Sequence, residues 1–245
     1  MNLSLLSKNM IHVWQVCLST LSHDPVDLFQ WLSTDERLRA QNFARPELRS
    51  EFVIAHAALR SILCQYCGLP PERICFKLNN YGKPALEYAE SLPVEFNLTH
   101  SAGLSLIVVS QCEVGIDLER YRIQTDPLEL GRSIFSPIEL ELLETLPKLD
   151  QQRVFFDLWT RKEALLKAIG CGLLSNPTNF TATDCWPIQT LEVSDDLKQS
   201  WTVCSLNLDS QYSAAVCRLG NVFDIKIYDW QSDGMLTGFR QATPK

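Results

Sequence analysis

The sequence predicts an α+β protein built from two similar halves. Stretches with helical periodicity and stretches with strand-like alternation occur in both halves, and each half has a helix followed by several strands. In addition, FNLTHSAGLSLIVVS at residues 96–110 resembles LNLDSQYSAAVC at residues 206–217. This internal likeness favours a duplication with pseudo-two-fold symmetry, whose halves meet near residues 105–120. We therefore divide the chain into an N-terminal half, residues 1–112, and a C-terminal half, residues 113–245.

Composition restricts the class of protein. The chain has 245 residues, of which 46% are hydrophobic and 21% charged, as in ordinary folded soluble proteins. Its net charge of −7 argues against a general nucleic-acid binder but allows a local basic cleft for a phosphorylated ligand. No apolar run approaches the ~20 residues that a membrane span needs, and the N-terminus lacks a basic, cleavable secretion signal.

The cysteines favour a reducing compartment. Nine cysteines are scattered through a chain without an export signal, so we expect reduced thiols and a cytoplasmic protein. Cys64 and Cys67 form a C-x-x-C pattern inside a predicted helix. Because no second pair provides further ligands, core packing is a better interpretation than a zinc or redox site.

The N-terminal half reads as a strand, two helices and then short strands. The predicted strands are residues 10–20, 75–78, 94–100 and 104–110, and the predicted helices are residues 27–38 and 49–67. The last two strands form a hairpin, and residues 79–86 form a turn that contains Lys83. Arginines 37, 39, 45 and 49 belong to the helical region. Each alone is typical of a solvated helix face, whereas together they could grip a phosphate.

The C-terminal half begins with a strand at residues 113–120 and continues with two helices. The first helix, residues 132–146, has Ser136 as its N-cap, Pro137 at its first position and Glu139 completing a capping box. The second, residues 153–169, ends before Gly170. Further strands are predicted at residues 178–191, 200–206, 213–219 and 224–229, and the polar end, 232–245, is expected to be frayed.

Two acids on the strand at residues 113–120 are candidate metal ligands. Alternation places Ile116 and Leu118 on one face and Asp117 and Glu119 on the other, with the two carboxylates about 6.5–7 Å apart along the strand. That arrangement suits one hard divalent cation, which prefers oxygen ligands. The alternative is an acidic edge that faces solvent. Gly115 indicates a close backbone approach.

The helix at residues 153–169 carries a second group of candidates. Trp159, Glu163 and Lys167 recur every four residues and therefore share one stripe, with Lys162 beside Glu163. A carboxylate between two lysines beneath an indole could hold a metal and an anion together. The alternative is an exposed Lys–Glu–Lys face whose ion pairs contribute about 0.2–0.5 kcal/mol each.

His100 is a candidate binding residue at the end of a strand. A lone histidine is usually structural or exposed. This one belongs to NLTHS, residues 97–101, a dense group of hydrogen-bonding side chains beside a turn, and that position favours a binding role.

The ordered set of motifs resembles one family. The sequence has no G-x-x-x-x-G-K-[ST], G-x-G-x-x-G, H-E-x-x-H or G-x-S-x-G motif, so common nucleotide, protease and esterase classes lose support. The motifs that do occur are YGKPAL (81–86), FNLTHS (96–101), VGIDLER (114–120), FSPIELELL (135–143) and FFDLWTRKEALLKAIGCGL (155–173). In this order they resemble the surfactin-synthetase-type 4′-phosphopantetheinyl transferases, over about residues 10–220.

The resemblance implies an activity and a cleft. Enzymes of this family move phosphopantetheine from coenzyme A to a serine of an apo carrier protein and release adenosine 3′,5′-bisphosphate. The implied fold has two similar α+β halves with coenzyme A in the cleft between them. The implied partner is an apo acyl carrier protein, or a carrier domain of polyketide or nonribosomal peptide synthases. Whether fatty-acid, polyketide or peptide synthesis is served stays open, and the resemblance implies a monomer.

The resemblance also implies roles for individual residues. Asp117, Glu119 and Glu163 would bind Mg²⁺, Glu163 would act as general base, and Lys167 would neutralise charge on the phosphate. The residues implied to bind coenzyme A are Arg39, Arg49, Lys83, Thr99, His100, Lys162 and Lys167, with His100 at the 3′-phosphate. One position departs from the family pattern. Glu51 stands where a basic residue is usual, so Arg39, Arg45 or Arg49 would have to replace it.

Two other functions remain open. The chain could be a non-catalytic relative that binds coenzyme A or a carrier protein and transfers nothing. It could also be a different Mg²⁺-dependent phosphoryl or nucleotidyl enzyme. The acidic and lysine positions that catalysis needs are all present, which favours the transferase.

Overall fold

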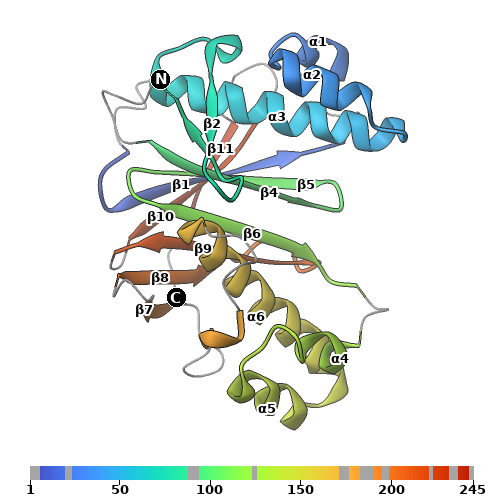
Figure 1. Cartoon of the computed structure of the whole chain (residues 1–245), viewed down its shortest axis with the longest axis vertical. Coiled ribbons are helices and arrows are strands. Elements are labelled where there is room, and N and C mark those ends of the chain that lie inside the picture. Colours follow the sequence, from blue (N-terminus) through green and yellow to red (C-terminus); the bar gives the residue numbers. More distant parts are fainter. Residues whose placement is uncertain are drawn as a thin grey trace.

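The computed structural model has an α+β fold with two main sheets (Figure 1). It describes residues 6–19, 24–87, 94–122, 126–170, 177–182, 190–194, 199–220, 223–231 and 237–242. The layers follow the order helix, sheet, sheet, helix, since a 22-residue helix covers the outer face of each sheet. The predicted fold class is therefore confirmed, and within the described residues each half has one long helix packed on a sheet.

The first sheet has the strand order β11-β10-β1-β5-β4. Its strands are β1 (Met10–Cys17), β4 (Glu95–Ser101), β5 (Leu104–Ser110), β10 (Asp224–Asp229) and β11 (Thr237–Ala242). β4 and β5 form the predicted hairpin. β10 pairs in parallel with β1, so the last strands of the chain return to the sheet of the N-terminal half. The expectation of a frayed end is wrong for β11, which pairs with β10.

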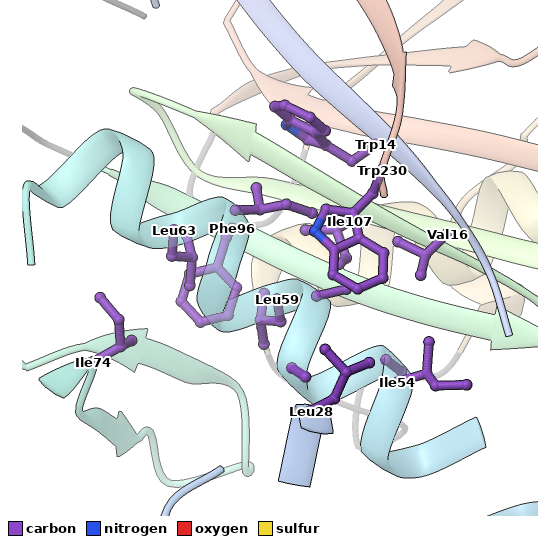
Figure 2. Packing of buried hydrophobic residues seen from close by; sticks show 14 of the residues in the cluster. Trp14, Val16, Leu28, Ile54, Leu59, Leu63, Ile74, Phe96, Ile107 and Trp230 are labelled. Carbon is purple, nitrogen blue, oxygen red and sulfur yellow. The ribbon is translucent and has the colours of Figure 1, made fainter. Parts of the chain in front are cut away.

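The helices of the N-terminal half are α1 (Pro25–Phe29), α2 (Thr34–Gln41) and α3 (Pro46–Cys67), followed by η1 (Pro71–Arg73). The single helix expected at residues 27–38 is two helices. Ser33 starts the second one, because its side chain accepts from the N–H of Glu36 while Glu36 caps the N–H of Ser33. α3 packs on the first sheet, and Figure 2 shows Leu59 and Leu63 in the same cluster as Phe96 and Ile107.

The second sheet has the order β6-β9-β8-β7. Its strands are β6 (Val114–Arg120), β7 (Thr190–Ser194), β8 (Ser200–Ser205) and β9 (Tyr212–Leu219). Helix α6 (Lys148–Ile169) lies directly on β6. A Cβ atom on Gly115 would lie 2.2 Å from the carbonyl oxygen of Ala164 and 2.3 Å from the nitrogen of Ala168. The predicted close approach at Gly115 is confirmed, and it brings the acids of β6 next to α6.

Two short helices, α4 (Pro127–Gly131) and α5 (Pro137–Thr145), pack at the far end of α6 (Figure 1). The capping box of Ser136 and Glu139 forms as predicted, with Pro137 in the first turn. The other short elements are β2 (Phe76–Leu78), β3 (Pro84–Leu86) and η3 (Pro177–Asn179). Much of the strand predicted at residues 178–191 lies outside the described residues, and η3 occupies its described beginning. None of the described helices has the length and apolarity needed to cross a membrane.

The two sheets meet along β4 and β6, where side chains take the place of a backbone ladder. Asn97 on β4 accepts a 3.0 Å hydrogen bond from the N–H of Ile116, and Ser101 accepts one of 3.2 Å from the N–H of Arg120. Edge strands with unsatisfied N–H groups are costly, so these bonds stabilise the junction. They also align β4 side by side with β6.

The domain boundary proposed at residue 112 remains a prediction. β6 begins the second sheet directly after it, while β10 and β11 belong to the first sheet. The sequence alone does not predict that β10 and β11 join the first sheet. The parallel pairing of β10 with β1 joins residues more than 200 positions apart, such as Met10 and Asp224.

Candidate active site

The main cavity lies beside the junction of β4 and β6, between α3 and α6. It has a volume of about 640 Å³. Its lining from the N-terminal half is Arg39, Phe43, Leu48, Glu51, Phe52, Ala55, His56, Leu98, Thr99 and His100. Its lining from the C-terminal half is Asp117, Leu118, Glu119, Trp159, Glu163 and Lys167. Both halves therefore contribute to one cleft, and seven of the expected site residues line it.

Asp117 is the most buried acid of the cavity, with 4% of its surface exposed. Its Oδ1 lies 2.5 Å from the Nζ of Lys167 and accepts a 3.3 Å hydrogen bond from the hydroxyl of Thr99. The same ammonium group donates to Thr99 at 3.3 Å. Its Oδ2 is buried and has no hydrogen-bond partner within the described part of the chain. One side of this carboxylate is thus satisfied by lysine, and the other has an unused lone pair.

Glu119 lies two residues further along β6, on the same face as Asp117. It accepts hydrogen bonds from Ser101, at 3.3 Å, and from the indole of Trp159. Burial raises the pKa of Glu119, and the negative charge of Asp117 raises it further. The predicted alternation of β6 is confirmed, since Ile116 and Leu118 are buried in the core between the sheets.

Glu163 projects into the cavity from α6, one helical turn before Lys167. Burial raises the pKa of its carboxyl group, the charge of Asp117 acts in the same direction, and Lys167 opposes both. The charge of Asp117 therefore repels the carboxylates of Glu119 and Glu163 and disfavours their ionised forms. A bound cation, or a proton, would relieve this repulsion.

The metal site is only partly formed by these side chains. Among the residues that the structure describes, no group of three or more His, Cys, Asp or Glu side chains is arranged to hold a metal ion. Lys167 neutralises Oδ1 of Asp117. Even so, the donor chemistry fits a hard cation, because three carboxylates reach one cavity and Oδ2 of Asp117 is buried without a partner.

The candidate binding residues of the N-terminal half divide into two groups. Arg39 and His100 line the main cavity, and the guanidinium of Arg39 lies 5.2 Å over the ring of Phe52. Partial burial lowers the pKa of His100, as do His56, Lys167 and Arg39, whereas Glu51 raises it. Arg49 is not among the lining residues, and its guanidinium lies 5.8 Å over the ring of Phe29 instead.

Lys83 lines a smaller, adjoining cavity of about 280 Å³ near the end of α6. Its ammonium donates to the carbonyls of Val114, at 3.2 Å, and Ala168, at 2.7 Å. Glu163 and Lys167 line both cavities, so they lie on the boundary between the two. Lys83 thus ties its turn to the end of α6, next to the pair Glu163 and Lys167.

Lys162 does not reach either described cavity. Its side chain is fully buried and forms a 2.8 Å ion pair with Glu139. Its ammonium also donates to the carbonyls of Pro177 and Phe180, each at 2.6 Å. These three acceptors match the three donors of an ammonium group. The expectation that Lys162 binds coenzyme A is therefore replaced by a structural role that connects α5, α6 and residues 177–182.

Sequence reasoning missed the aromatic and basic wall formed by Phe52 and His56. Their rings stack with centroids 4.0 Å apart, and Phe43 packs against Phe52 at 5.3 Å. The spacing of four residues on a helix was an available signal for this contact. The partner of His56, Glu36, belongs to another helix and had no such signal.

Comparison with known proteins gives consistent matches. A family model described as the 4′-phosphopantetheinyl transferase superfamily matches residues 113–217. The 4′-phosphopantetheinyl transferase HetI of Nostoc sp. is 38% identical over 225 residues, which cover 89% of this chain and 91% of the relative. The 4′-phosphopantetheinyl transferase psf-1 of Bacillus pumilus is 32% identical over 193 residues, which cover 79% of each.

A solved structure, the holo-[acyl-carrier-protein] synthase of Thermotoga maritima, is 16% identical with a TM-score of 0.30, covering 51% of this chain and 72% of that one. The matches to the family model and to the two relatives confirm the resemblance that the ordered motifs predicted.

Proposed function

This chain belongs to the 4′-phosphopantetheinyl transferases, which transfer phosphopantetheine from coenzyme A to carrier proteins, and on that premise we propose how its residues carry out the transfer. The coenzyme A pyrophosphate lies in the main cavity against Lys167. The acceptor serine approaches beside Glu163. This arrangement is supported by one observation above all: Glu163 and Lys167 lie one helical turn apart on the boundary of both cavities.

Glu163 is the general base of this proposal. It removes the proton of the serine hydroxyl while the serine oxygen forms a bond to the phosphorus that bears the pantetheine. The bridging P–O bond of the pyrophosphate breaks, and adenosine 3′,5′-bisphosphate leaves. The raised pKa of Glu163 makes its carboxylate a better proton acceptor than an exposed glutamate.

Lys167 stabilises the charge that develops on the phosphate oxygens. Its ammonium is oriented by Asp117 and Thr99, both of which it contacts. Preorganised charge in a partly buried site lowers the barrier because it needs no rearrangement during the reaction. Arg39 and His100, on the opposite wall, bind the remaining phosphate of coenzyme A.

We propose that the enzyme depends on Mg²⁺, held by Asp117, Glu119 and Glu163. A bound Mg²⁺ ion would supply Lewis-acid neutralisation of the pyrophosphate. The Oδ2 of Asp117, which has no hydrogen-bond partner among the described residues, and the raised pKa values of Glu119 and Glu163 support this assignment. Lys83 we assign to the smaller cavity, where it supports the end of α6.

The acceptor we propose is an apo acyl carrier protein, or a carrier domain of polyketide or nonribosomal peptide synthases. We further propose a monomer that acts in the cytoplasm. Cys64, Cys67, Cys75, Cys112 and Cys217 form no disulfide within the described part of the chain, which suits a reducing compartment.

The test is incubation of the protein with coenzyme A, MgCl₂ and an apo carrier protein, followed by intact-mass measurement of the carrier. A gain of one phosphopantetheine is the expected result, and chelation of the metal should abolish it. Binding of coenzyme A without a mass gain would support a non-catalytic relative. Transfer at an unchanged rate after chelation would remove the Mg²⁺ assignment and leave the transfer itself standing.

A further inference from the structure

The charges of the main cavity are separated between its two walls. The wall of the C-terminal half carries the three carboxylates together with Lys167. Among the described lining residues, the wall of the N-terminal half carries Arg39, His56 and His100 as basic groups and Glu51 as its acid. Of these basic groups, His56 has no role in the chemistry described above. It lies on α3, beside the aromatic ring of Phe52.

The ring of His56 is held by a buried network. Its Nδ1 lies 2.9 Å from Oε1 of Glu36, whose other oxygen accepts from the N–H of Ser33, at 2.8 Å, and from Arg60, at 2.7 Å. Burial works against ionisation of Glu36, but the hydrogen bonds from His56, Ser33 and Arg60 prevail and lower its pKa to about 2. Glu36 is therefore a carboxylate, so Nδ1 of His56 donates the hydrogen bond to it.

This network fixes which atom of His56 is available to a ligand. Since Nδ1 is bonded to Glu36, Nε2 is the remaining polar atom of the ring, and 24% of the side chain is exposed. Arg60 is 2% exposed and donates to the carbonyls of Ile74 and Pro71, at 2.7 and 3.0 Å, which anchors the whole network. Arg39 lies over the same Phe52 ring that stacks on His56. One aromatic ring thus supports two groups at the cavity wall that can donate to an anion: the guanidinium of Arg39 and, when the imidazole is protonated, the Nε2–H of His56.

We propose that His56, oriented by Glu36 and Phe52, binds the ribose 3′-phosphate of coenzyme A together with Arg39. The proposal rests on the proposed function, which places the reacting pyrophosphate against Lys167 on the other wall. Coenzyme A has only one further phosphate, the one on its ribose, and the basic wall is where a second anion is stabilised.

The test compares two donors, coenzyme A and 3′-dephospho-coenzyme A, in the wild type and in His56→Ala. Loss of a hydrogen bond to a charged group should raise KM for coenzyme A about tenfold or more, with kcat nearly unchanged. KM for the dephospho donor should change less than twofold. Glu36→Gln should show the same selectivity in weaker form, and Arg73→Ala, which removes an exposed charge outside the cavity, should leave both KM values as they are.

A second measurement separates the possible failures. Titration calorimetry with adenosine 3′,5′-bisphosphate and with adenosine 5′-monophosphate reports binding without transfer, and thermal melting shows that each variant is folded. Equal losses for both donors, or no loss for either, would overturn the role of His56. If His56→Ala does not fold, His56→Gln takes its place in both assays. A wild type that neither binds coenzyme A nor transfers from it would instead refute the proposed function.

Discussion

Lys167 of α6 and Asp117 of β6 form a 2.5 Å ion pair across 50 positions of the sequence. The pair exists because Gly115, two residues before Asp117, lets the helix backbone lie directly on the strand. A side chain at that position would separate the two elements. The same close contact brings Glu163 into the cavity that contains Asp117 and Glu119.

Replacement of Glu163 by glutamine should lower kcat by about 10²–10⁴-fold, because the amide cannot accept the serine proton. The melting temperature should stay close to that of the wild type. Phosphopantetheine transfer followed by mass measurement gives the rate. Glu144→Gln on the exposed face of α5 is the matched control, and full activity in Glu163→Gln would remove the general-base assignment.

Lys167→Ala should reduce kcat about 10²-fold or more and change KM for coenzyme A much less. The reason is that the charge of Lys167 matters most when negative charge develops in the transition state. Steady-state kinetics at saturating carrier protein separates the two constants. An unchanged kcat with a raised KM would mean that Lys167 only binds the donor.

Lys162→Met should destabilise the fold without a specific effect on coenzyme A binding. Removing one partner of a buried ion pair costs about 3–5 kcal/mol, since Glu139 would be left with an uncompensated charge. Denaturant unfolding measures the loss. The double variant Glu139→Gln/Lys162→Met should recover part of it, because glutamine removes the buried charge and keeps an acceptor for the N–H of Ser136. A folded Lys162→Met protein with a strongly raised KM for coenzyme A would contradict the structural assignment.

Gly115→Ala should destabilise the protein by about 1–3 kcal/mol, because the added methyl group meets the backbone of Ala164 and Ala168. Backbone atoms cannot move aside as a flexible side chain can. The change should also lower kcat, since α6 carries Glu163 and Lys167. Ser133→Ala, at an exposed position, is the control, and a melting temperature equal to the wild type would show that α6 does not lie so close to β6.

His12 should make the stability of the protein depend on pH. Burial, reinforced by the charge of Lys226, lowers its pKa from 6.5 to about 4. A histidine held neutral in the folded state contributes stability that is present above pH 6.5. That contribution is lost as the pH falls from 6.5 towards 4, because His12 of the unfolded chain takes up a proton before His12 of the folded protein does. The free energy of unfolding falls by about 3 kcal/mol at most. Urea unfolding of His12→Gln across this range should show a shallower decline than the wild type; equal slopes would contradict the prediction.

The sequence by itself determined the local features of the site. Alternation along β6 placed Asp117 and Glu119 on one face, and the four-residue spacing on α6 placed Glu163 and Lys167 on one stripe. The capping box at Ser136 formed as predicted. These features depend on contacts within a few residues, or on the fixed period of a strand or helix, so the pattern is sufficient to predict them.

Only the tertiary structure decided which of these residues share a cavity. Neighbouring lysines on α6 have different surroundings: Lys162 is buried against Glu139 and two carbonyls, whereas Lys167 reaches Asp117. The return of β10 to β1 and the bond between His56 and Glu36 likewise join distant segments. The local pattern of a helix fixes its faces, but the residues that each face meets depend on how the whole chain packs.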